Sequence, residues 1–177
     1  VKKIIKFASD ITEKVKQRTE YQAQIDAINK AQAVIEFALD GTILTANENF
    51  LSLMGYKNSE IIGKHHRLFV PPAEAQSSDY QHFWKKLRQG EYQTADYQRV
   101  TRNGEYVWIH ATYNPIRNQQ GEVYKIIKFA SDITAEIRKK EEIKMLSMVA
   151  NETDNAVIIT DTQRTVIYAN TGFERMI

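Results

Sequence analysis

Two adjacent histidines are the first residues of this sequence whose chemistry would suit a metal or cofactor site. His65 and His66 stand between Lys64 and Arg67 in the stretch KHHR. Imidazole nitrogens are common metal ligands, but neighbouring helical residues point in different directions, so the two rings are poorly placed to hold one ion. The flanking cations would also repel a metal. We therefore predict a solvated or anion-facing turn, from which one histidine could still reach the edge or the iron of a haem.

The other two histidines and the two tryptophans form a second group of candidates. His82 lies in YQHFWKKL, where we interpret it as a partly exposed surface residue, with haem ligation as the alternative. His110 stands two residues after Trp108, where we expect a packed or cross-strand residue that could donate a hydrogen bond to a ligand. Trp84 and Trp108 could stack on a planar cofactor such as flavin, although core packing is the simpler explanation for both.

Composition excludes several classes of function. The chain of 177 residues has no cysteine, which rules out disulfides, thiolate metal sites and a cysteinyl flavin adduct. A net charge of +2 with interspersed acids and bases gives no reason to expect nucleic acid as a partner. No apolar run reaches the roughly 18 residues of a membrane span, so we expect no membrane contact and a cytoplasmic location. Phosphate-loop, nucleophile-elbow, zinc-protease and kinase motifs are also absent from the sequence, so we expect no enzyme.

An internal repeat determines how these candidates are arranged along the chain. KIIKFASDIT occurs at Lys3–Thr12 and again at Lys125–Thr134, and GTILTANENF at 41–50 resembles RTVIYANTGF at 164–173. A period of about 120 residues indicates tandem domains of ordinary size. We divide the chain into the last strand of one repeat (1–12), a linking helix (13–32), a complete domain (33–134), a second linking helix (135–150) and the beginning of a further repeat (151–177). The chain starts within a strand-like run and without Met, so we expect a piece of a longer protein.

The complete domain combines two groups of strands with helices between them. Periodicity and turn residues predict strands at Ala33–Leu39, Thr42–Ala46, Tyr92–Arg102, Tyr106–Arg117 and Glu122–Asp132. They also predict a short helix at Glu48–Met54, capped by Asn47, and a long one at Ala73–Arg88. This order is typical of the α+β class. Large side chains occupy both faces of the long strands, so we expect the short helices to cover one face and a flanking helix or a partner subunit the other.

At this point the sequence resembles the PAS domain family. The resemblance rests on DGTILTANENFLSLMGYKNSEIIGK (40–64), VTRNGEYVWIHATYNPIRNQQGE (100–122) and the ending DIT. It covers 33–134 completely and 1–12 and 156–177 in part. KHHRLFV and FWKKLRQGEYQ are most similar to sensory PAS domains of bacterial chemoreceptors and cyclic-di-GMP enzymes.

The resemblance implies a five-stranded antiparallel sheet, with a pocket between its face and the short helices, flanked by N- and C-terminal linking helices. It also implies that the first and last strands are neighbours. Haem b and FAD are the cofactors it suggests. By alignment, oxygen-sensing histidine kinases place their haem ligand nearer Ser78, one turn before His82. We expect either a sensor with such a cofactor or a cofactor-free module for homodimerisation, through the flanking helices and the sheet, and for relay to adjacent PAS repeats and an effector.

Two further expectations concern the ends of the domain. Asp132 and Thr134 can bond exposed backbone where the last strand enters the following helix, so we expect this junction to relay a signal. The partial repeats would each leave strand edges bare. We therefore predict that Lys3–Ala8 pairs with Ala156–Thr160.

Overall fold

The computed structural model describes residues 11–151 and 155–175, which divide into two compact units, the first ending at Asp132 and the second starting at Ile133. The first unit contains a five-stranded antiparallel sheet in the order β2-β1-β5-β4-β3. Its strands are β1 (Ala33–Phe37), β2 (Ile43–Ala46), β3 (Gln93–Val100), β4 (Tyr106–Arg117) and β5 (Val123–Asp132). The expected α+β class and sheet are confirmed.

The first and last strands of the domain are neighbours, as expected from the resemblance. β1 pairs with β5 from Ala33 opposite Ala130 to Phe37 opposite Ile126. β5 also pairs with β4, so it is the central strand of the sheet. The strand that leaves the domain is therefore bonded on both edges, and β3 forms one outer edge.

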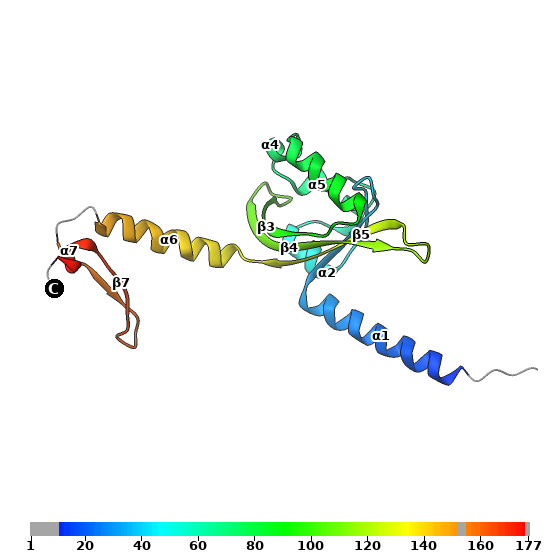
Figure 1. Cartoon of the computed structure of the whole chain (residues 1–177), viewed down its shortest axis with the longest axis horizontal. Helices are drawn as coiled ribbons and strands as arrows, with labels where there is room; N and C mark the ends of the chain where they lie inside the picture. The colour runs from blue at the N-terminus through cyan, green and yellow to red at the C-terminus, as the bar shows by residue number, and fades with distance from the viewer. Residues whose placement is uncertain (1–10, 152–154, 176–177) are drawn as a thin grey trace, which may run out of the picture. The chain divides into compact units, whose positions relative to one another are not determined.

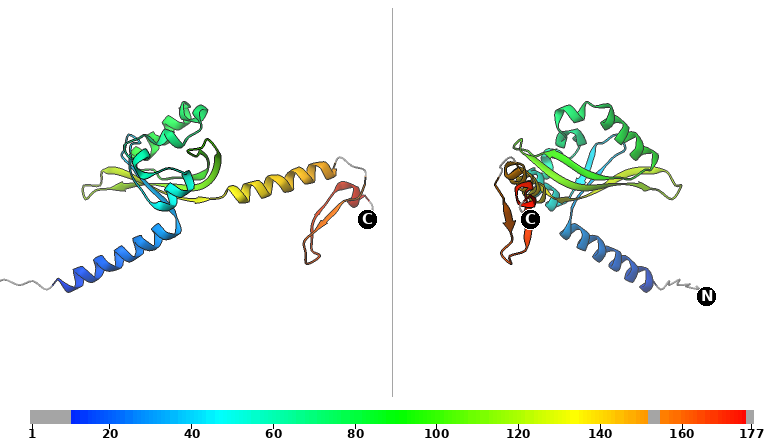
Figure 2. Two further views of the ribbon diagram at one scale, coloured as in Figure 1. Left: turned by 180° about the vertical axis from the view of Figure 1, so that it is seen from behind. Right: turned by 60° about the vertical axis from the view of Figure 1, so that its left-hand side comes forward.

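The helices between β2 and β3 lie on one side of the sheet (Figures 1 and 2). They are α2 (Glu48–Met54), α3 (Asn58–Ile61), the 3-10 helix η1 (His66–Phe69), α4 (Pro72–Ala75) and α5 (Ser78–Gln89). The single long helix expected at Ala73–Arg88 is wrong, because Ser77 starts a new helix by accepting a hydrogen bond from the Tyr80 backbone N–H at 3.1 Å. This break separates the short α4 from α5, and Glu74 of α4 pairs with Arg99 of β3.

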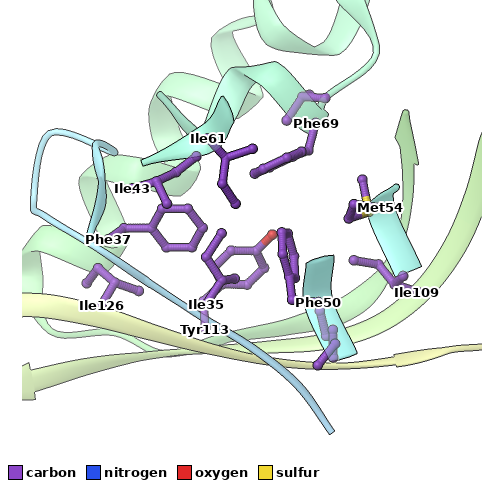
Figure 3. Packing of buried hydrophobic residues seen from close by; sticks show 14 of the residues in the cluster. Ile35, Phe37, Ile43, Phe50, Met54, Ile61, Phe69, Ile109, Tyr113 and Ile126 are labelled. Atoms are coloured by element: carbon purple, nitrogen blue, oxygen red, sulfur yellow. The ribbon is translucent and has the colours of Figure 1, made fainter. Parts of the chain in front are cut away.

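The core lies between these helices and the inner face of the sheet (Figure 3). The Tyr113 ring of β4 rises among Ile35, Phe37 and Phe50 and is fully buried. Phe37 stacks on it with ring centroids 6.4 Å apart. Aromatic and branched side chains from every layer therefore fill the centre of the domain.

The opposite face of the sheet carries apolar side chains that are only partly covered. Trp108, Ile127 and Phe129 are half-buried, and their strand neighbours Ile109 and Lys128 point to the core. Cover by a flanking helix or a partner subunit stays a prediction.

Helix α1 (Thr12–Ala31) precedes the sheet and has no buried residue. The second unit consists of α6 (Thr134–Asn151), a hairpin of β6 (Ile158–Thr160) and β7 (Val166–Ala169), and α7 (Thr171–Glu174). Among the described helices, none is both long enough and apolar enough to cross a membrane. The predicted partner of Ala156–Thr160, Lys3–Ala8, lies outside the described residues, and within the second unit β6 pairs with β7.

The repeat seen in the sequence recurs in the geometry of the two units. Asn47 accepts hydrogen bonds from the backbone N–H groups of Val34 and Phe50, both at 2.9 Å, and so ties β1 to the start of α2. Asn170 accepts the equivalent bonds from Val157 at 2.8 Å and Phe173 at 3.0 Å. The two units therefore contain the same hairpin–helix arrangement, with the helix capped by the same residue type.

Candidate functional site

A buried histidine joins the helices to the sheet. His66 opens η1, where its backbone N–H donates to the Gly41 carbonyl at 2.8 Å, and its side chain is fully buried. Its Nδ1 lies 2.8 Å from the Tyr80 hydroxyl of α5. Its Nε2 lies 3.0 Å from the Tyr113 hydroxyl of β4. The expectation of a solvated turn is therefore wrong for His66, because the turn that carries it is folded under α5.

A neutral imidazole can make both hydrogen bonds of the triad His66, Tyr80 and Tyr113, and burial favours this neutral form. A neutral ring has one donor and one acceptor nitrogen, so one tyrosine donates to His66 and the other accepts from it. Burial lowers the pKa of His66 well below 6.5, and the nearby cations Arg99 and Lys128 lower it further. Burial also raises the pKa of Tyr80 to about 12. The Trp84 indole N–H lies close enough to the Tyr80 hydroxyl to oppose that rise but forms no well-aligned hydrogen bond.

Arg99 is a buried cation on the inner face of β3. Its Nη1 donates to the Gln98 carbonyl at 2.7 Å and pairs with the Glu74 carboxylate at 3.2 Å. Its Nη2 lies 3.4 Å from the Tyr113 hydroxyl, and its guanidinium carbon lies 4.6 Å from the Tyr97 ring centroid. The guanidinium is thus held by β3, β4 and α4 together.

Lys128 is a second buried cation, on the inner face of β5. Its ammonium nitrogen lies 5.1 Å from the Tyr113 ring centroid and 5.5 Å from that of Phe50. Burial lowers the pKa of Lys128 well below 10.5, and the charge of Arg99 acts in the same direction. No Asp or Glu side chain is buried in the described part of the chain. The interior therefore has more positive than negative groups, and the Glu74 side chain, which is 41% exposed, offsets only part of the excess.

Two hollows border this cluster. A groove of about 600 Å³ runs along η1 and α5 and is lined by Asp40, His65, Arg67, Ala75, Gln76, Tyr80, Gln81, Trp84 and Arg88. A smaller cavity of about 280 Å³ opens between α4, α5 and β3 and is lined by Glu74, Asp79, Tyr80, Phe83, Tyr97 and Arg99. Tyr80 lines both, so the triad lies between the two hollows.

The six residues predicted from the sequence fall into four places. His65 and Trp84 line the groove, and a Cβ at Gly41 would lie 2.7 Å from His65 Nε2, so only glycine allows this approach. His66 lies in the core below them.

The remaining three predicted residues lie away from the two hollows. His82 is exposed on α5, so it does not point into the interior. Trp108 and His110 lie on the opposite face of the sheet, where His110 Nδ1 pairs across the strands with Asp96 at 2.7 Å. The expectation that His110 is a cross-strand residue is therefore confirmed.

The interior does not fit the cofactors expected from the sequence. Both ring nitrogens of His66 are engaged by tyrosines, so haem iron would have to break the triad. A haem or a tricyclic flavin ring would also have to displace Phe37, Phe50, Phe69 or Tyr113, which fill the space between sheet and helices. Among the described residues, no three His, Asp or Glu side chains cluster as metal ligands.

Comparison with known families agrees with this architecture. A family model described as the PAS fold matches residues 43–130, and a second, described as a PAS domain, matches residues 144–177. The chain belongs to the PAS domain family. The two matches lie in the two structural units, so the PAS domains are arranged in tandem.

One curated relative and two solved structures show how far the likeness extends. The chain is 44% identical over 137 residues to the biofilm dispersion protein BdlA of Pseudomonas aeruginosa, which covers 77% of the chain. The chain spans only about a third (33%) of that relative's length. The PAS domain of a Colwellia psychrerythraea protein has a TM-score of 0.58 at 20% identity, covering 65% of the chain and 98% of that domain. A light-oxygen-voltage domain studied with a flavin analogue has a TM-score of 0.54 at 22% identity, covering 69% and 96%. These two structures share the fold.

Sequence reasoning missed Arg99 and Lys128, although the sequence holds a signal for both. Lys128 stands between Ile126 and Ala130 in a strand where every second residue faces the core. Arg99 follows Tyr97 at the same spacing in β3. A cation at an inward position of an alternating strand is a marker of a buried charge, and both positions could have been singled out on that ground.

Proposed function

We propose that residues 33–134 are a signal-input module that takes a chemical signal on the helix-covered face of the sheet and passes it through β5 to α6. The observation that carries this proposal is the buried connection centred on Tyr113. Its hydroxyl contacts Arg99 of β3 and His66 of η1, and its ring lies under the Lys128 ammonium of β5. A change at either hollow would therefore alter groups that rest on the exit strand.

The exit strand and the following helix are separated by a single residue. β5 ends at Asp132 and α6 begins at Thr134. At the start of α6, the Ile137 backbone N–H donates to the Ile133 carbonyl at 3.0 Å. A shift of β5 would act directly on this bond, and two arrangements of such a junction are sufficient for signalling.

Removal of the Tyr113 hydroxyl tests the connection without any ligand. In Tyr113→Phe the contacts to Arg99 and His66 are lost, so we expect the packing of β5 to change and the hydrogen exchange of the Ile137 amide to change several-fold. Tyr124→Phe is the matched control, because Tyr124 lies on β5 but is exposed. Unchanged exchange at Ile137 in Tyr113→Phe, despite altered exchange in β4 and β5, would contradict the proposal.

A flavin input stays a prediction beside this proposal. One solved structure that shares the fold is a light-oxygen-voltage domain studied with a flavin analogue. In this chain a flavin could not form a cysteinyl adduct, because the sequence has no cysteine, and the interior described above would have to open for it. An absorbance spectrum of the purified chain decides the matter: paired flavin bands with fluorescence would establish the cofactor, and a colourless protein that stays so after incubation with FAD would exclude it.

The outer face of the sheet favours dimerisation as a second role. Trp108, Ile127 and Phe129 lie there half-buried, and covering them with a second copy would remove apolar surface from water. Sedimentation of the chain and of Phe129→Lys tests this role. We expect a dimer that the substitution dissociates; a monomeric parent chain would refute it.

A further inference from the structure

The smaller cavity has a fixed cation at its base and aromatic walls. Arg99 supplies the cation, and Tyr80, Phe83 and Tyr97 supply the walls. Arg99 is 1% exposed, and its guanidinium is anchored on three sides, by the Gln98 carbonyl, the Tyr113 hydroxyl and the Tyr97 ring. Arg99 is therefore in place before any ligand arrives.

The hydrogen-bonding capacity of Arg99 is not fully used. A guanidinium has five N–H donors, yet the buried Nε of Arg99 has no partner. Buried donors without partners are uncommon and cost free energy. The site thus contains a donor that a second oxygen of an anion could satisfy after a small adjustment.

The acid that pairs with Arg99 is weakly held. Glu74 makes one contact of 3.2 Å, from Oε1 to Nη1, instead of the two parallel bonds of a strong arginine–carboxylate pair. Its side chain is 41% exposed, and its helix α4 has only four residues. Glu74 can turn toward water, whereas Arg99 is held in the interior by the Gln98 carbonyl and the Tyr113 hydroxyl and gains from a carboxylate that reaches it.

The walls and the volume define the ligand that could take this place. About 280 Å³ accommodates a single aromatic ring with a short polar group, and the three wall residues favour an aromatic body. Asp79 also lines the cavity and would repel a second negative charge. We propose that this cavity binds a small aromatic monocarboxylate, whose carboxylate replaces that of Glu74 on Arg99.

Ligand exchange at Arg99 would also release α4. Glu74 would lose its anchor to β3, while the new carboxylate would hold Arg99 against the Tyr113 hydroxyl. This step rests on the proposed function, because it supplies the signal that the Tyr113 connection would pass to β5.

Titration of the whole chain with benzoate tests the inference. We expect saturable binding in calorimetry together with a shift of the Arg99 Nε–H resonance. Benzamide has the same shape without the charge and should bind at least about tenfold more weakly, since hydrogen bonds between charged groups are the stronger ones. Phthalate carries a second carboxylate and should also bind more weakly. Equal binding of benzoate and benzamide would overturn the proposal.

Two substitutions keep the result interpretable. Arg99→Gln should abolish benzoate binding, but it also removes a core charge. Glu74→Gln leaves Arg99 in place and removes only its competitor, so benzoate should bind about tenfold more tightly, by about 1.4 kcal/mol. Glu105→Gln, an exposed residue outside the cavity, is the control and should bind like the parent chain. Unchanged affinity in Glu74→Gln would contradict displacement of Glu74.

The outcomes separate this inference from the proposed function. Benzoate binding without any change of exchange at Ile137 would contradict the relay and support the carboxylate site. In the opposite outcome, hydrogen exchange at the Ile137 amide responds to Tyr113→Phe, but benzoate binds neither the parent chain nor Glu74→Gln. That result would contradict the carboxylate site alone.

Discussion

At the scale of single residues, the domain keeps three basic side chains in its core. His66, Arg99 and Lys128 are each buried, and each contacts Tyr113. A different feature reduces the cost of burying each one. His66 is a neutral ring, Arg99 has a partial ion pair with Glu74, and the Lys128 nitrogen lies near two aromatic rings. Charged groups in a core are costly unless they are paired and hydrogen-bonded.

Lys128→Met should stabilise the domain at neutral pH. The folded state lowers the pKa of Lys128 below its unfolded value of 10.5, so the unfolded state binds the proton more tightly. Burial of Lys128 therefore lowers the free energy of unfolding by its full amount at pH values below the folded pKa. This loss of stability shrinks as the pH rises from the folded pKa to 10.5. We expect a gain of about 1–4 kcal/mol in the free energy of unfolding near pH 7, typical of replacing a buried charge by an apolar group.

Urea unfolding at neutral and alkaline pH measures the Lys128 effect. The gain from Lys128→Met should shrink as the pH approaches 10.5. Lys125→Met is the matched control, because Lys125 pairs with Glu36 at 2.8 Å on the outer face and should lose about 1 kcal/mol or less. A destabilised Lys128→Met would show that the ammonium is held by interactions stronger than the two aromatic contacts.

His66 should make the domain sensitive to acid. Its folded pKa lies well below the unfolded value of 6.5, so acid protonates the unfolded state first. The free energy of unfolding should therefore fall as the pH drops through 6.5 toward the folded pKa. His66→Asn should be less stable at neutral pH, by about 1–3 kcal/mol for an unsatisfied tyrosine hydroxyl, but should show a flatter dependence on pH between 7 and 5.

Denaturation curves across that pH range provide the test for His66. Exposed His82 is the control position, and His82→Asn should follow the parent chain. A parent chain whose stability is level from pH 7 to pH 5 would contradict the neutral buried ring.

At the scale of elements, local sequence signals predicted the strands well and the helical segment less well. The strand at Tyr106–Arg117 and the helix at Glu48–Met54 have the expected bounds. Period-two alternation and an Asn cap are local features, so one sequence is sufficient to find them. The break at Ser77 and the burial of η1 depend on how α5 packs over the sheet, which the sequence does not state residue by residue.

The same distinction explains the candidate site. The three basic residues His66, Arg99 and Lys128 meet because β3, β4, β5 and η1 converge on Tyr113, and Trp84 of α5 packs against His66. The resemblance placed a pocket between sheet and helices, but it did not say which side chains fill that space. His66 was misjudged because its neighbours Lys64 and Arg67 suggested solvent, whereas these two residues are exposed and the His66 position between them is buried.

The cap that recurs in both units should be essential to the first. Asn47 also donates from its side-chain amide to the carbonyls of Asn29 and Gln32, at 3.0 and 2.8 Å. It therefore joins α1, β1 and α2, and Asn47→Ala should cost about 2 kcal/mol or more of unfolding free energy, the upper end for a cap. Asn58→Ala is the control, because Asn58 is exposed at the start of α3 and should cost about 0.5 kcal/mol or less. Equal thermal denaturation of the two variants would contradict this role of Asn47.

At the scale of the whole molecule, two PAS units follow one another, and α6 begins the second directly after β5 of the first. In this arrangement the last strand of one domain leads along the chain into the first helix of the next. The sequence KIIKFASDIT occurs at Lys3–Thr12 and again at Lys125–Thr134, and the second copy forms most of β5 and the start of α6. We expect a tandem array of this kind to transmit through its junctions, with Asp132 and Thr134 as the relay residues.

The central claim is that the Tyr113 connection controls the junction between β5 and α6. A four-protein cycle tests it most directly: the parent chain, Tyr113→Phe, the Asp132→Ala/Thr134→Ala double variant, and the triple variant, each measured by hydrogen exchange at the Ile137 amide. The account predicts that Tyr113→Phe changes this exchange several-fold in the parent background and leaves it unchanged in the double-variant background. An equal effect of Tyr113→Phe in both backgrounds, or no effect in either, would contradict it.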